Sequence, residues 1–141
     1  WMPLARQAMH QQNELIHAAV WPSVNEVHML ASRHYAFEGR CFVIAAGSVL
    51  ERDHFPVDVD LLDEMPGTGP FMTGGSAIIA PNAQIIAGPA GQEETLVVAD
   101  IDPGLALEYS MTLDVAGHYS RPDVFTLLVN EEPQVNVRAE K

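Results

Sequence analysis

Cys41 is the only thiol in the 141-residue chain, so it is the only candidate for a cysteine nucleophile. A nucleophilic cysteine needs an exposed thiolate with a base or a cation beside it. Cys41 instead opens the apolar run from Cys41 to Ala46, where a small buried hydrophobic side chain is the ordinary interpretation. We therefore expect Cys41 to be structural. A single cysteine also excludes an internal disulfide bond.

Histidines and acidic residues raise the hypothesis of a metal site, and six histidines are present: His10, His17, His28, His34, His54 and His118. No His-x-x-Glu-His or paired Cys-x-x-Cys spacing accompanies them. The acidic loop from Leu50 to Gly75 lacks the alternating Asp/Asn pattern of a calcium loop, and its glycines precede no helix that opens with Lys-Ser/Thr. The residues by themselves thus show no catalytic constellation, and we predict neither a metal nor a cofactor.

The stretch from Trp21 to Gly47 contains the clearest signals of secondary structure. Ser23, followed three residues later by Glu26, matches a capping box and predicts a helix from about Val24 to Glu38. Gly39 is expected to take a positive φ just past the last turn. Apolar residues at three- and four-residue spacing predict the buried stripe of this helix: Val24, Val27, Leu30, Ala31, His34 and Phe37.

The run Cys41 to Ala46 follows this helix without any alternation of polar residues, which favours a strand covered on both faces. A helix that leads into such a strand indicates a layered α/β protein. The other predicted elements are a helix at Met2 to Met9, a strand at Leu15 to Val20, a hairpin of Ser76 to Ala80 with Gln84 to Ala87, a strand at Thr95 to Ile101, a helix at Leu105 to Val115 and an edge strand at Phe125 to Val129.

Composition limits the possible partners. Seven Lys and Arg against nineteen Asp and Glu give a formal charge of −12, which argues against nucleic acid and anionic membranes as partners. We find neither a membrane span nor a signal peptide in the sequence and expect a cytoplasmic protein. The chain enters a helical pattern almost at once after Trp1, and we expect it to be cut from a longer sequence.

Several strings, in this order along nearly the whole chain, resemble the C-terminal half of a nitrilase, in the carbon–nitrogen hydrolase superfamily. The most specific are Glu38-Gly39-Arg40-Cys41-Phe42-Val43 and Gly117-His118-Tyr119-Ser120-Arg121-Pro122-Asp123-Val124, supported by Met2-Pro3-Leu4-Ala5-Arg6 and Trp21-Pro22-Ser23. The resemblance implies an α/β fold that is half of an αββα sandwich. It assigns residues 1–130 to the hydrolase domain, and the polar composition of residues 131–141 predicts a disordered tail.

Nitrilases hydrolyse nitriles to carboxylic acids and ammonia with a Glu-Lys-Cys triad. The resemblance implies that the nucleophilic cysteine falls a few residues upstream of Trp1, and the glutamate and lysine earlier still, so that no catalytic residue lies in this chain. Cys41 occupies a strand position of the family, not that of the nucleophile. We therefore expect the isolated chain to be inactive. The alternatives are a cyanide-hydrolysing relative, a non-catalytic oligomerisation module from a truncated gene and, more weakly, an amidase.

The resemblance also implies positions for contacts. Trp21 and Pro22 become candidates for binding the nitrile substrate of the full-length parent, with core packing as the alternative for Trp21. The helices at Met2 and Val24 are implied to pair two subunits in a homo-oligomer, and the tail from Gly117 to Val129 to join further subunits. Arg6 and Glu38 are either partners in a buried ion pair or, for Arg6, a solvated helix residue.

Overall fold

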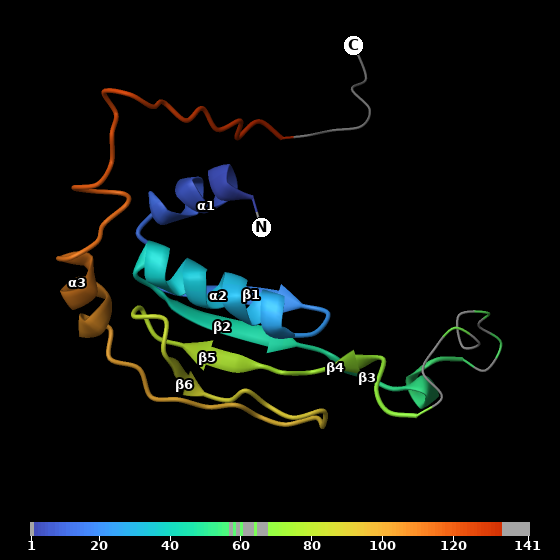
Figure 1. The fold of residues 1–141 in the computed structure, drawn as a ribbon. Coiled ribbons are helices and arrows are strands. Elements are labelled where there is room, and N and C mark those ends of the chain that lie inside the picture. The colour runs from blue at the N-terminus through green and yellow to red at the C-terminus, as the bar shows by residue number, and fades with distance from the viewer. Residues whose placement is uncertain (1, 57, 59, 61–63, 65–67, 134–141) are drawn as a thin grey trace, which may run out of the picture.

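The computed structural model describes residues 2–56, 58, 60, 64 and 68–133. Its helices are α1 (Pro3–His10), α2 (Glu26–Gly39), the 3-10 turn η1 (Arg52–His54) and α3 (Gly104–Ser110). Its strands are β1 (Ile16–Trp21), β2 (Phe42–Gly47), β3 (Val49–Leu50), β4 (Met72–Thr73), β5 (Ala77–Ile79) and β6 (Ile85–Ala87). Figure 1 shows α1 and α2 beside a sheet of order β1-β2-β5-β6.

The strands β1 and β2 are parallel neighbours, with Ile16 opposite Phe42 and Trp21 opposite Gly47, and α2 connects them. The predicted strand–helix–strand order is thus a true βαβ unit. The predicted hairpin is present as β5–β6, and its antiparallel pairing with β2 continues the sheet. One cluster of buried side chains joins α2 to the sheet: Ala19, Val24, Tyr35, Ala36, Cys41, Val43, Ala45 and Ile79.

The helix α2 ends within one residue of the predicted Glu38, but both predicted caps are wrong. Asn25 caps the helix, its side-chain oxygen accepting from the His28 N–H, while the Ser23 hydroxyl accepts from the Thr73 N–H. At the other end Arg40, not Gly39, takes the left-handed conformation, with φ 51°. Gly39 stays helical and lies against the His10 ring, where an added Cβ would be 2.4 Å from Cε1. Its small size therefore serves close packing and not a positive φ.

The predicted buried stripe of α2 is also wrong for most of its members. Val27, Leu30 and Phe37 are 55%, 68% and 45% exposed, whereas the buried residues of the helix are Ser32, Tyr35 and Ala36. The apolar periodicity marks the outer face of α2, and a face of this kind is typical of contact with another surface.

The opposite face of the sheet is open in part, although Phe42 and Ile78 on the same face are buried. Ile16, Val20 and Ile44 are 46%, 79% and 42% exposed, and the register of β1 with β2 places them on the face away from α2. The prediction that β2 is covered on both faces is thus right only in part, because on this face Phe42 is 1% exposed whereas Ile44 is uncovered. The helices form one layer, the sheet a second, and an apolar surface remains bare.

The segments after β6 contain less regular structure than predicted. Residues 95–101 form no strand, and Leu96 and Val98 are 86% and 70% exposed. The helix α3 ends at Ser110 and not near Val115, and residues 125–129 form no edge strand. Figure 1 shows the chain after α3 leading away as an extended arm towards α1.

The ends of the acidic loop from Leu50 to Gly75 are paired. The strands β3 and β4 form a two-stranded antiparallel sheet, with Val49 opposite Thr73. Residues 57, 59, 61–63 and 65–67 of the loop, and residues 134–141 of the predicted tail, lie outside the described residues. Within the part of the chain that the structure describes, no helix is long and apolar enough to cross a membrane.

Candidate functional site

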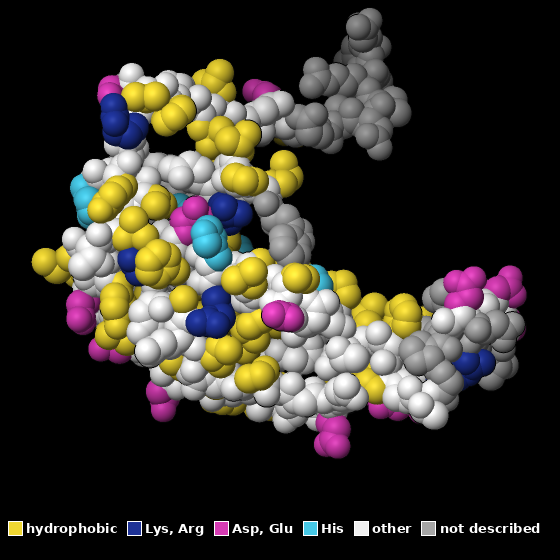
Figure 2. Space-filling view, viewed as in Figure 1, with side chains coloured by type: hydrophobic (Ala, Val, Ile, Leu, Met, Phe, Trp, Pro, Cys, Tyr) yellow, Lys and Arg dark blue, Asp and Glu magenta, His cyan; other side chains and the backbone are white. Residues whose placement is uncertain are grey.

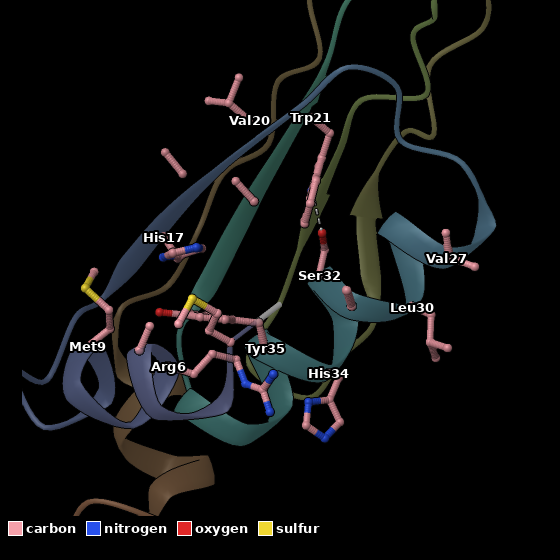
Figure 3. Close-up of a pocket in the computed structure, with 15 residues that line it drawn as sticks. Arg6, Met9, His17, Val20, Trp21, Val27, Leu30, Ser32, His34 and Tyr35 are labelled. Carbon is pink, nitrogen blue, oxygen red and sulfur yellow. Dashed lines mark hydrogen bonds between the residues drawn. The ribbon is translucent and has the colours of Figure 1, made fainter. Parts of the chain in front are cut away.

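A groove of about 860 Å³ lies between α1, β1 and α2 (Figure 3). Its walls are mostly apolar, with Met2 and Met9 from the α1 side and Val27 and Leu30 from α2. Arg6, His17, His34 and Tyr35 add polar groups. In Figure 2 hydrophobic side chains are interspersed with Arg, His and acidic side chains over the surface that α1 and α2 form.

The two predicted substrate-binding residues occupy different positions. Trp21, at the carboxyl end of β1, lines the groove, donates from Nε1 to the Ser32 hydroxyl at 3.1 Å and packs 4.7 Å from the His28 ring. Pro22 is exposed and is not among the groove residues; its carbonyl accepts from the Ser48 N–H. The structure does not bring the two side chains into one pocket.

A carboxylate in the loop before β1 organises the inner end of the groove. The Tyr35 hydroxyl donates to Glu14 Oε1, and His17 Nδ1 lies 3.0 Å from Glu14 Oε2. The His17 ring stacks on Tyr35 with 3.9 Å between centroids. Burial, followed by the hydrogen bond to Glu14, raises the pKa of Tyr35, so this phenol stays protonated and acts as a donor.

A second carboxylate, that of Glu38 near the end of α2, binds α1. Its Oε2 accepts from Arg6 Nε at 2.8 Å and lies 3.4 Å from His10 Nε2. Burial tends to raise the pKa of Glu38, but the hydrogen bond and the charge of Arg6, together with His10 and His34, outweigh it and hold this pKa below its ordinary value. The open question about Arg6 is thereby decided in favour of a partly buried ion pair.

His10 links the two carboxylates. It is 3% exposed, and its Nδ1 lies 3.5 Å from Glu14 Oε1 while its Nε2 faces Glu38. The sequence reasoning missed this network because it examined the histidines as metal ligands. No helical spacing signals it, because Glu14 lies in the loop between α1 and β1 and Glu38 lies 28 positions from His10.

Cys41 is fully buried, as expected from its apolar surroundings. Burial, with a smaller contribution from the charge of Glu14, raises the pKa of its thiol to about 12. A thiol in this state has almost no thiolate near neutral pH, so it is not an activated nucleophile. Among the described residues no group of three or more His, Cys, Asp or Glu side chains is arranged to hold a metal ion.

These features define a class: a layered α/β scaffold with helices against one face of a mixed sheet, a groove between two of its helices and no activated thiol. The chain belongs to the carbon–nitrogen hydrolase family, whose model matches residues 1–110.

Three relatives illustrate the similarity. A nitrilase of Bradyrhizobium diazoefficiens is 37% identical over 134 residues, covering 95% of this chain and 42% of the relative. An aliphatic nitrilase of Sinorhizobium fredii is 38% identical, covering 95% of this chain and 44% of the relative. Nitrilase 1 of Arabidopsis thaliana is 38% identical, covering 96% of this chain and 41% of the relative. The chain thus spans less than half the length of the curated relatives it matches.

Proposed function

We propose that this chain is the C-terminal part of a nitrilase, which hydrolyses a nitrile to a carboxylic acid and ammonia with a Glu-Lys-Cys triad. The triad belongs to sequence upstream of Trp1, and residues 1–130 form the C-terminal half of the hydrolase domain. Similarity to proteins named nitrilases over about 95% of the chain carries this proposal. The burial of Cys41, the only thiol, supports the expectation that the chain alone is inactive.

The open sheet face supports the half-sandwich. Ile16, Val20 and Ile44 present apolar surface on the side away from α2, where the second sheet of an αββα sandwich packs. Exposed apolar surface of this kind in a soluble enzyme requires a cover. In this arrangement the missing half supplies both the second sheet and the chemistry, and we keep the cytoplasm as the proposed compartment.

The substrate contact is proposed for Trp21 and Pro22 at the carboxyl end of β1. Trp21 lines the same groove as Met2, the residue that precedes α1, and this shared groove supports the proposal. Pro22 has weaker support, because it is exposed and outside the groove.

Homo-oligomers are proposed through two surfaces. The helix surface includes Leu4 of α1 with Val27 and Leu30 of α2, all more than half exposed. The tail from Gly117 to Val129 presents Phe125 and Leu128, which are 76% and 89% exposed. The same surfaces favour the alternative of a non-catalytic oligomerisation module.

Ammonia release tests the proposal. The chain is assayed with aliphatic and aromatic nitriles, cyanide and an amide, alone and after mixing with a matching N-terminal half that carries the Glu, Lys and Cys. We expect ammonia from nitriles in the mixture only. Activity of the chain alone refutes the assignment of the triad, whereas an inactive mixture that still oligomerises supports the non-catalytic alternative.

A further inference from the structure

The helix α1 is held to the rest of the fold mainly by polar side chains. Of its residues Pro3–His10, all of which the structure describes, only His10 is buried. The large apolar side chains at or next to it, Met2, Leu4 and Met9, are 69%, 67% and 41% exposed. Hydrophobic burial, which orients most helices, therefore contributes little to fixing α1.

A single oxygen of Glu38 supplies much of the missing attachment. Glu38 Oε2 lies 2.8 Å from Arg6 Nε and 3.4 Å from His10 Nε2, so one atom contacts two residues of α1 that are one helical turn apart. His34 of α2 lies 3.9 Å from the same oxygen. Two contacts along the helix constrain its rotation as well as its distance from α2, which a single contact does not.

The carboxylate is itself well placed to hold this geometry. Glu38 lies in the last turn of α2, next to Gly39, on which the His10 ring packs. On its other side His10 faces Glu14, which in turn accepts from Tyr35 of α2. The end of α1 is thus enclosed between two carboxylates that are both tied to α2.

We propose that Glu38 is a positioning residue, which orients α1 through Arg6 and His10 and thereby sets the backbone just upstream of Met2. This inference rests on the proposed function, which places the nucleophile in that upstream backbone. A displacement of about 1 Å in a reacting group lowers turnover by roughly a hundredfold, so a loosened α1 reduces the rate of the chemical step more than substrate binding.

The test uses Glu38→Gln, which removes the charge and keeps the size of the side chain. Glu26→Gln is the matched control, since Glu26 is an exposed carboxylate at the opposite end of α2. Hydrogen exchange of the α1 amides is measured in the 141-residue chain. The kcat and KM for nitrile hydrolysis are measured in the mixture with the N-terminal half, with kcat normalised to the folded fraction.

We expect Glu38→Gln to raise α1 exchange at least about tenfold and to lower kcat by roughly ten- to a hundredfold with KM within about twofold, while Glu26→Gln changes neither. Arg6→Gln combined with Glu38→Gln should lower kcat no further than Glu38→Gln alone, because Glu38→Gln already removes the contact with Arg6. Unchanged α1 exchange, or faster exchange with unchanged kcat, overturns the proposal. An unmodified mixture that releases no ammonia instead overturns the proposed function, and the exchange result then still decides whether Glu38 holds α1.

Discussion

Replacing Gly39 by alanine separates tertiary packing from helix propensity, because the two predict opposite signs. Gly39 is the last residue of α2, and alanine there favours the helix by about 1 kcal/mol on propensity alone. The added Cβ, however, would lie 2.4 Å from His10 Cε1 and 2.5 Å from Nδ1. No side chain accepts such contacts without moving.

The His10 ring has little room to move. Its side chain is 2% exposed and lies between Glu14 and Glu38. Overpacking costs about 1 to 3 kcal/mol, and displacing the ring weakens a hydrogen bond worth about 1 kcal/mol. Against the propensity gain of about 1 kcal/mol, we expect Gly39→Ala to lower the free energy of unfolding by about 1 to 3 kcal/mol.

Urea denaturation followed by circular dichroism measures this change. The control is Gly39→Ala in a His10→Ala background, where the obstructing ring is absent and alanine should stabilise by up to about 1 kcal/mol. If Gly39→Ala stabilises the protein with His10 in place, the packing argument is refuted.

Three further outcomes follow from the same contacts. Arg40→Gly relieves a left-handed backbone at φ 51° but removes the hydrogen bonds from the guanidinium to the carbonyls of Leu113 and Pro81. Charged hydrogen bonds contribute about 1.5 to 3 kcal/mol each, and relief of the left-handed backbone returns about 1 kcal/mol. We therefore expect Arg40→Gly to lower the free energy of unfolding, measured by urea denaturation, by about 2 to 5 kcal/mol. An unchanged midpoint would contradict this expectation. Cys41 should react with a disulfide reagent at pH 8 at least about a hundredfold more slowly in the folded chain than in urea, because burial raises its pKa to about 12; equal rates would show that the thiol is accessible. Glu38 has a folded-state pKa below its ordinary 4.5, so its contribution to stability is present above that pH and is lost as the pH falls through the lower folded value. The difference in unfolding free energy between the native chain and Glu38→Gln should therefore shrink as the pH falls below about 4.5, and a difference independent of pH would show that the Arg6 pair is unimportant.

Local signals in the sequence sufficed for much of the scaffold. The apolar runs ending near Val20 and Ala46 predicted β1 and β2, proline in the first turn predicted α1, and the turn at Pro81-Asn82 predicted the β5–β6 hairpin. These elements depend on residue types within a few positions, which a sequence displays directly. The family was recognised in the same way, from short strings in a fixed order.

The ends and faces of the elements required the tertiary structure. Ser23 has the right spacing for a capping box, yet its hydroxyl accepts from Thr73, fifty positions away, and Asn25 takes the cap. Thr95 to Ile101 has a strand-like composition but forms no ladder, because strand formation depends on a partner as much as on propensity.

The candidate site shows the same division. The sequence by itself determined that the thiol opens a buried apolar run, that no metal-binding motif is present and which family the chain resembles, because each depends on residue type and short spacing. Only the tertiary structure decided that Arg6 and His10 share one oxygen of Glu38, that Trp21 lines a groove while Pro22 does not, and that the apolar stripe of α2 faces outward. Those features join segments up to about thirty positions apart, and periodicity identifies an apolar face without identifying what covers it.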